Sequence, residues 1–234
     1  MRLNSYIAKS GITSRRKADK LIFEGKIKVN GKTVSNPAID IGEKDKVEFN
    51  GKILKPQEYK YFIFNKPVKV ITTANDPQGR KTVLDFFKKE KIRLFPVGRL
   101  DYDTSGLIFV TNDGEFSNKL MHPSKNKNKI YIVTSDKFLK KEALTRFSKG
   151  IIIEDRKTSA SKIYFLKKTS DGYVYKVIIH EGFNRQIRKM FDYFGAKVKK
   201  LKRIEIAGVK LKNLKEGEYR ELTKKEYETL METK

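Results

Sequence analysis

The chain has 234 residues, of which 53 are Lys or Arg and 28 are Asp or Glu, so its formal net charge is +25. It has no cysteine and two histidines, which excludes disulfides, thiolate zinc sites, iron–sulfur clusters and cysteine nucleophiles. A hydrophobic fraction of 38% is sufficient for a packed core. Because no apolar run reaches the ~18 residues of a membrane helix and no secretory leader is evident, we expect a cytoplasmic protein.

The excess of cations has two explanations. Lysine-rich solvated surfaces are common in proteins and need no partner. A basic protein can also be adapted to a polyanion, because its charge steers association with phosphate backbones. Composition alone favours a nucleic-acid partner over the first explanation.

Residues 1–55 have the pattern of a small separate domain. A first short helix is expected to start at Leu3 and to stop before Gly11. A second helix is expected over 15–24, with Ser14 as its N-cap. The segment holds 13 basic and 6 acidic residues, a net charge of +7.

Two Asn-Gly pairs follow these helices, Asn30-Gly31 and Asn50-Gly51, each between alternating apolar residues. Asn and Gly both tolerate the positive φ angles of a type I′ turn, so each pair predicts a β-hairpin. Residues 56–60 break both helix and strand patterns and are expected to form a linker.

The two helices and the first hairpin resemble the S-four-type RNA-binding domain, also called the alpha-L motif. The matching strings are SRRKA at 14–18 and GKIKVNG at 25–31. The resemblance implies RNA contacts from the cations around the start of the second helix, which are Arg15, Arg16, Lys17 and Lys20. The alternative is a small basic domain that only solvates its charge.

Residues 61–234 mix strand and helix patterns and are expected to form a second domain. Strands are expected at 61–64, 68–73, 106–111, 130–134, 160–166, 173–180 and 204–211, and helices at 82–91, 115–121, 139–147, 185–194 and 223–232. Several connections are too short for a crossover helix, which predicts an α+β domain with a mixed, largely antiparallel sheet.

The chain has neither of the glycine motifs that bind nucleoside triphosphates or dinucleotides, so we expect no cofactor and no metal. Chemistry must then come from carboxylates, tyrosines and cations. Asp101 precedes the apolar run at 106–111, where a sheet can hold a carboxylate against a loop-lined cleft, a suitable place for a nucleophile. On the residues alone, a turn-forming aspartate is the better explanation.

The string GRLDYDTSGLIFVTNDGEFSNKLMHP at 98–123 resembles the catalytic segment of the RsuA family of bacterial ribosomal RNA pseudouridine synthases, in its single-site, large-subunit branch. Further matching strings are NKP at 65–67, DPQGRKTV at 76–83, KIY at 129–131 and EGFNRQIRKMF at 181–191. The match covers nearly the whole chain in the family's order. It departs at Lys69, where glycine is usual, and at Phe183, where a basic residue is common.

This resemblance implies that a uridine in ribosomal RNA, expected to be that of the large subunit before its assembly is complete, is isomerised to pseudouridine by a monomer without a cofactor. Asp101 is implied to be the catalytic aspartate, Tyr131 to pack on the uracil and transfer a proton, and Arg188 to pair with the catalytic carboxylate. Arg99 is implied to take the place of the flipped-out nucleotide. Further RNA contacts are implied for Asn184, Arg185 and Gln186.

Two alternatives remain open on the sequence. A non-catalytic RNA-binding protein or ribosome-assembly factor could keep the same scaffold, but it predicts the loss of Asp101 or Tyr131, and both are present. The second alternative is a synthase that acts on small-subunit rRNA or transfer RNA. The strings at 76–83 and 120–123 favour the large-subunit branch over it. For Asp101, attack on the ribose and assistance to an elimination are equally compatible with the sequence.

Overall fold

The structure, a computed structural model, describes residues 1–74, 76–122 and 127–232. The chain divides into two compact units, one comprising Met1–Lys60 and Lys88–Leu94 and the other Tyr61–Phe87 and Phe95–Lys234. Pro123, the last residue of the matching string at 98–123, lies outside the described residues. Among the described residues, no helix has the length and apolar character needed to cross a bilayer.

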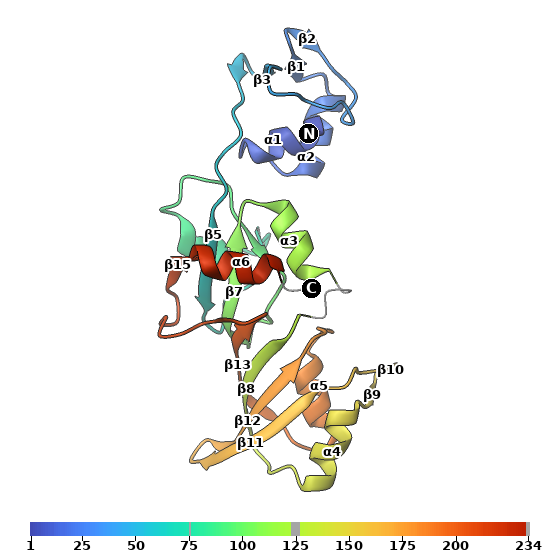
Figure 1. Cartoon of the computed structure of the whole chain (residues 1–234), viewed down its shortest axis with the longest axis vertical. Coiled ribbons are helices and arrows are strands. Elements are labelled where there is room, and N and C mark those ends of the chain that lie inside the picture. The colour runs from blue at the N-terminus through green and yellow to red at the C-terminus, as the bar shows by residue number, and fades with distance from the viewer. Residues whose placement is uncertain (75, 123–126, 233–234) are drawn as a thin grey trace. The chain divides into compact units, whose positions relative to one another are not determined.

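The first unit contains the two predicted helices and a four-stranded antiparallel sheet (Figure 1). Its elements are α1 (Leu3–Lys9), α2 (Arg15–Phe23), β1 (Ile27–Val29), β2 (Lys32–Thr33), β3 (Val47–Phe49) and β4 (Lys52–Ile53). Ser14 caps α2, because its side chain accepts a hydrogen bond from Lys17 N at 3.3 Å. Both Asn-Gly pairs have positive φ angles and join antiparallel strands, which confirms the two hairpins.

The second unit is built on a nine-stranded sheet with helices packed against it (Figure 1). Its elements are β5 (Tyr61–Lys66), a 3-10 helix (Val83–Phe87), β6 (Phe95–Val97), β7 (Ser105–Thr111), α3 (Gly114–Met121), β8 (Lys129–Ser135), α4 (Lys141–Lys149), β9 (Ile152–Ile153), β10 (Arg156–Lys157), β11 (Lys162–Thr169), β12 (Gly172–Ile179), α5 (Gln186–Tyr193), β13 (Val198–Ile206), β14 (Val209–Lys210), β15 (Tyr219–Glu221) and α6 (Lys224–Glu232). The strand order is β11-β12-β8-β13-β7-β5-β15, and β6 and β14 pair with β7 and β13. All these pairs are antiparallel except β13–β7, so the predicted α+β fold with a largely antiparallel sheet is confirmed.

The structure corrects three of the expected elements. The strand expected at 204–211 is the hairpin β13–β14, because Ala207 and Gly208 have positive φ angles that reverse the chain. The helix expected at 82–91 is the single 3-10 segment Val83–Phe87. The strand expected at 68–73 is reduced to one bridge at Ile71, and Lys69 has a left-handed φ of 62° that interrupts an extended chain.

Gly106 allows β7 to approach β13 closely. It pairs with Arg203 in the parallel ladder and has a φ of 110°. A Cβ at this position would lie 2.2 Å from the carbonyl oxygen of Arg203, which is backbone and cannot move aside cheaply. The approach of these two strands therefore requires glycine here.

We predict that Gly106→Ala lowers the free energy of unfolding by about 2–4 kcal/mol, because the new methyl group meets backbone and the φ angle disfavours an L side chain. Urea denaturation followed by circular dichroism measures this change. Gly114→Ala is the matched control, since nothing lies within 4 Å of its would-be Cβ, and it should stay within about 1 kcal/mol of the parent. Equal midpoints for the two variants would contradict the close approach.

Candidate active site

A cleft of about 750 Å³ opens in the second unit and gathers residues from distant parts of the sequence. Its walls come from the loop before β7, from β8 and β13, and from the loop that leads into α5. The predicted site residues that line it are Arg99, Asp101, Tyr131, Asn184, Arg185 and Gln186. Arg188 does not line the cleft and is 8% exposed.

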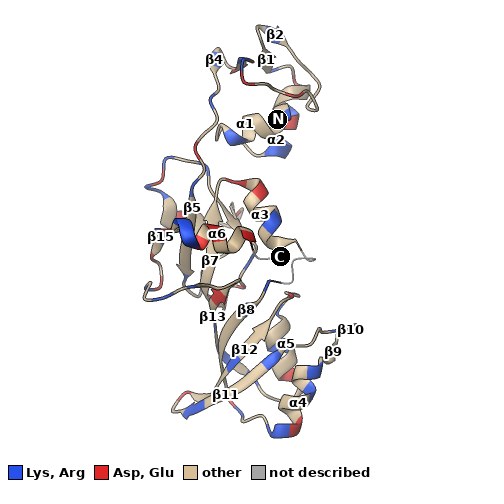
Figure 2. Ribbon diagram, in the orientation of Figure 1, with Lys and Arg blue, Asp and Glu red and all other residues tan. Residues whose placement is uncertain are grey.

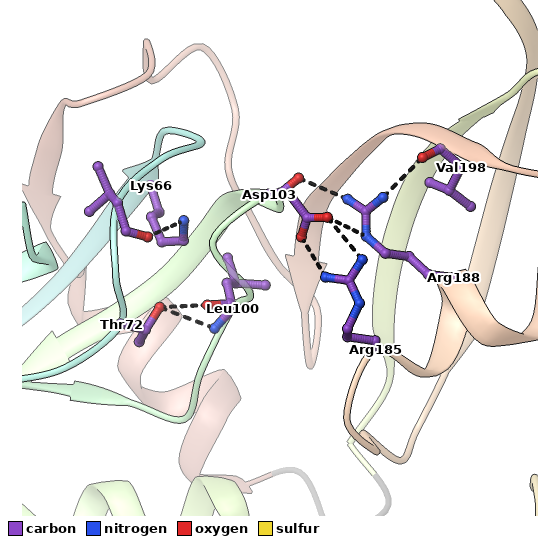
Figure 3. A network of polar contacts seen from close by, with 8 residues as sticks. Lys66, Thr72, Leu100, Asp103, Arg185, Arg188 and Val198 are labelled. Atoms are coloured by element: carbon purple, nitrogen blue, oxygen red, sulfur yellow. Dashed lines mark hydrogen bonds and ion pairs between the residues drawn. The ribbon is translucent and has the colours of Figure 1, made fainter. Parts of the chain in front are cut away.

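The backbone on both sides of Asp101 is tied to neighbouring segments. Thr72 Oγ1 donates to Leu100 O at 2.8 Å and accepts from Leu100 N at 3.2 Å (Figure 3). Lys69 N donates to Tyr102 O at 2.7 Å. The Asp101 carboxylate is half-buried and, within the described chain, makes no hydrogen bond or ion pair. The loop thus fixes the position of Asp101 while its carboxylate stays available to a substrate.

Two arginines from the start of α5 hold the carboxylate of Asp103. Arg185 contacts it with both terminal nitrogens, at 3.0 and 3.1 Å, and Arg188 Nε lies 3.2 Å from Oδ2 (Figure 3). Arg188 also donates to Asp103 O at 2.8 Å and to Val198 O at 3.0 Å. We call this group, Asp103 with Arg185 and Arg188, the Asp103 clamp. It joins the loop that carries Asp101 to α5.

The clamp corrects the expected pairing of Arg188. The ion pair expected between Arg188 and Asp101 is formed with Asp103, whose backbone carbonyl also accepts from Arg188. Desolvation acts to raise the pKa of Asp103, but hydrogen bonds from Arg185 and the charges of both arginines outweigh it and hold the pKa below its ordinary value. Burial lowers the pKa of the Arg188 guanidinium, which the charge of Asp103 opposes.

Arg203, which the sequence did not single out, lies beside Tyr131. The two residues are cross-strand neighbours on β13 and β8, and both are buried. Arg203 Nη1 lies 3.4 Å from the Tyr131 hydroxyl oxygen, and Nε donates to Leu107 O at 2.8 Å. Because the hydroxyl oxygen accepts from Arg203, its own proton can point toward the cleft. The run of lysines around Arg203 gave no signal that one cation turns inward.

Gln186, expected to contact RNA, has its amide engaged inside the protein. It is 3% exposed; its Nε2 donates to Glu181 Oε1 at 2.6 Å, and its Oε1 accepts from Phe183 N at 3.1 Å. Glu181 also accepts from Ser159 N and Oγ, both at 2.8 Å. These bonds order the loop at 181–185, which presents the exposed Asn184 to the cleft.

Two lysines near the cleft have pKa values below the ordinary value of a lysine. Lys66 is fully buried and donates to Pro67 O at 2.9 Å and Val70 O at 2.8 Å; burial lowers its pKa to about 8, against the attraction of the Asp101 and Asp103 charges. Burial and the charge of Arg203 likewise lower the pKa of Lys129 to about 8. Lys129 and Arg203 line the cleft with Asp101, and the charge of Asp101 also acts on the buried Lys66 and Arg188. These cations suit the cleft to an anionic substrate.

The predicted RNA-contacting cations of the first unit lie on the surface of α2, whose basic residues Figure 2 shows in blue. All four are exposed: Arg15, Arg16, Lys17 and Lys20. In the part of the chain that the structure describes, none of them forms an ion pair. They are therefore accessible to a polyanion, as the S-four-type resemblance implies.

The comparisons with known proteins agree with this arrangement. The family model described as "RNA pseudouridylate synthase" matches residues 60–193, and the S4 domain model matches residues 1–47. The chain is 46% identical over 231 residues to "Ribosomal large subunit pseudouridine synthase B" of Bacillus subtilis, covering 98% of this chain and 95% of that protein. It is 39% identical over 230 residues to "Dual-specificity RNA pseudouridine synthase RluF" of Escherichia coli, covering 95% of this chain and 76% of that protein.

A solved structure supports the same conclusion for the fold. "Crystal structure of pseudouridylate synthase" superimposes with a TM-score of 0.69 at 32% sequence identity, covering 98% of this chain and 99% of that chain. The motifs at 65–67, 98–123, 129–131 and 181–191 therefore reflect true kinship. The chain belongs to the RNA pseudouridylate synthase family, with an S4 domain preceding the synthase domain.

Proposed function

We propose that this protein isomerises a specific uridine of large-subunit ribosomal RNA to pseudouridine, acting as a monomer in the cytoplasm without a cofactor. The observation that carries the proposal is the Asp101 carboxylate, which has no partner among the described residues and lies in a cleft with Tyr131 and several cations. The name of the Bacillus subtilis relative supports the large subunit as the source of the RNA.

The proposed reaction rearranges bonds without a net gain or loss of atoms. The bond between uracil N1 and the ribose breaks, the base turns in the cleft, and a carbon–carbon bond forms between the ribose and uracil C5. The proton on C5 leaves, and N1 acquires one. Such a reaction needs a group that acts on the sugar, a group that transfers protons and a site that retains the free base, and these can all be side chains.

Asp101 is the group that we propose to act on the sugar, either by attack on the ribose or by promoting an elimination. Either route requires the carboxylate to be free and its backbone to be fixed. The bonds to Leu100 and Tyr102 supply the fixed backbone, and the charges of Lys66 and Lys129 near the cleft favour a negatively charged substrate.

Tyr131 is the group that we propose to pack on the uracil and to move the C5 proton. Its ring is buried in the wall of the cleft, and its hydroxyl oxygen accepts from Arg203 at 3.4 Å. A donor at that oxygen fixes the orientation of the hydroxyl group and leaves its proton free to face the cleft. Arg203 thus positions Tyr131 for proton transfer.

The target uridine must leave its stack to reach Asp101, at a cost of roughly a few kcal/mol. We propose that Arg99, which is exposed at the cleft, occupies the vacated space, and that Asn184 and Arg185 contact the RNA beside it. The S4 domain, residues 1–55 before a linker at 56–60, then supplies affinity through Arg15, Arg16, Lys17 and Lys20.

The target can be identified in cells that contain or lack the gene. Carbodiimide or cyanoethyl modification followed by mass spectrometry of ribosomal RNA should show one pseudouridine in large-subunit RNA that disappears with the gene. Loss of a pseudouridine from small-subunit or transfer RNA instead would contradict the proposed substrate. An unchanged pattern in every RNA would contradict the activity in the cell.

We predict that Asp101→Asn lowers isomerisation by more than about 1000-fold, or ~4 kcal/mol in the barrier, because an amide is a poor nucleophile and base. RNA affinity and stability should remain at parent levels, since the carboxylate makes no described bond in the protein. Single-turnover conversion of an rRNA fragment provides the rate.

Asp103→Asn is the matched control for that prediction, two residues along the same loop. It should lower the free energy of unfolding by about 1–2 kcal/mol, since it weakens the ion pair to the buried Arg188, and it should slow catalysis only in part. If Asp103→Asn removed activity completely while Asp101→Asn retained it, the catalytic assignment would pass to Asp103.

For Tyr131→Phe we expect single-turnover conversion to slow at least 100-fold with little change in RNA affinity, because the ring still packs but the hydroxyl is gone. If Arg203 acts through that hydroxyl, Arg203→Lys should lower the conversion rate markedly when Tyr131 is present. In the Tyr131→Phe background the same change should hardly lower it. If the losses of rate were additive in the double variant, Arg203 would not act through the Tyr131 hydroxyl. An unchanged rate in Tyr131→Phe would mean that the tyrosine has only a packing role.

The proposed role of the S4 domain can be tested in the full chain by changing Arg15, Arg16, Lys17 and Lys20 together to Gln. Each lost phosphate contact lowers the slope of log affinity against log salt by ~0.7–0.9, so RNA binding should weaken and become less salt-dependent. Conversion at saturating RNA should be kept. A normal salt slope would mean that these cations are only solvated.

A further inference from the structure

Four arginines line the cleft, and they differ in whether their guanidinium groups already have partners within the protein. They are Arg99, Arg156, Arg185 and Arg203. Arg185 is held by Asp103, and Arg203 is buried against Tyr131 and Leu107 O. Along the described ranges, neither Arg99 nor Arg156 has a carboxylate partner. Arg99 already has an expected role, whereas Arg156 has none.

Arg156 projects from a short hairpin that is fixed at its base. It begins β10, which pairs antiparallel with β9. Thr158 N donates to Ile151 O at 2.8 Å and Thr158 Oγ1 accepts from Ile151 N at 3.0 Å, so the two chain ends are joined. Glu154 in the turn forms an ion pair with Lys189 of α5 at 2.5 Å. The hairpin is therefore attached to the same helix that holds the clamp arginines.

The guanidinium of Arg156 stacks on the ring of Phe183. Its central carbon lies 3.6 Å from the ring centroid, within the range of a close cation–π contact. Phe183 is itself fixed, because its backbone N–H donates to Gln186 Oε1 in the ordered loop at 181–185. Stacking occupies one face of the guanidinium and leaves its N–H edges free to donate. Arg156 is exposed, so these donors are accessible at the cleft.

We propose that Arg156, held on Phe183, binds a backbone phosphate of the RNA strand next to the target uridine. The inference rests on the proposed function, which supplies a polyanion to this cleft. A planar, oriented guanidinium binds phosphate with paired hydrogen bonds, and an arginine held by stacking loses less side-chain freedom when it does so. The nearby Glu154 carboxylate is engaged by Lys189 and does not compete.

The test compares Arg156→Gln with two full-length control variants that each also lose one positive charge. Lys157→Gln changes the next residue of β10, which is exposed but does not line the cleft. Arg146→Gln removes another arginine that lies near an aromatic ring, 5.3 Å from the Tyr193 centroid and outside the cleft. Binding of a labelled rRNA stem-loop is measured by fluorescence anisotropy over a series of salt concentrations, and conversion is measured on the same RNA.

Arg156→Gln should weaken binding roughly five- to twentyfold and lower the salt slope by about 0.7–0.9, while conversion at saturating RNA stays at the parent rate. The two controls should change the slope far less. Adding Phe183→Lys to Arg156→Gln returns a cation to the same place and should recover most of the lost slope.

Three results would overturn the proposal. Equal slopes for Arg156→Gln and Lys157→Gln would show only a general charge effect. An unchanged slope with a lower conversion rate at saturation would place Arg156 in the chemistry instead of in phosphate binding. Weakened binding with an unchanged slope would indicate stacking of a base on the guanidinium. Because binding is measured separately from conversion, a parent protein that binds the stem-loop without converting it contradicts the proposed function and still tests Arg156.

Discussion

The Asp103 clamp is the interaction on which the geometry of the cleft depends. It joins the loop before β7 to the start of α5, and these segments supply most of the predicted site residues. Arg185, which makes two of these contacts, has a left-handed backbone with a φ of 54°, a conformation that is strained for a residue with a side chain. Because the pKa of Asp103 lies below its ordinary value, the clamp stabilises the fold at neutral pH and weakens as pH falls toward that pKa.

The clamp also explains how Asp101 can be fixed without being paired. Thr72 and Lys69 contact the backbone of the loop, and Arg188 contacts the backbone and the carboxylate of Asp103, so positioning does not consume the Asp101 carboxylate. A carboxylate held by its own ion pair would first have to lose that partner to react. Here the neighbouring Asp103 has the ion pairs, which separates the structural role from the proposed catalytic role.

Turn and cap signals in the sequence predicted local structure correctly, whereas apolar runs gave three wrong elements, at 68–73, 82–91 and 204–211. The two Asn-Gly hairpins and the Ser14 cap depend on residues close together in the chain, and the structure confirms all three. The partner of Arg188 and the inward position of Arg203 depend on segments about 70 to 85 residues away, which no local pattern reports. The motifs located the candidate site because a family resemblance carries long-range information, but they did not resolve which of two aspartates in one loop receives the arginines.

The two departures from the family's motifs have structural answers of different kinds. Lys69 replaces a usual glycine but keeps a glycine-like φ of 62°, so its N–H still reaches Tyr102 O and the Asp101 loop retains that anchor. Phe183 replaces a basic residue, and no backbone adjustment can restore a charge. In the proposal above the cation comes from another segment, because the guanidinium carbon of Arg156 lies 3.6 Å from the Phe183 ring centroid. Lys69 thus meets a requirement on backbone conformation by itself, at a modest cost in strain. A missing charge at Phe183 can be supplied only by a different residue that the fold brings close, here Arg156.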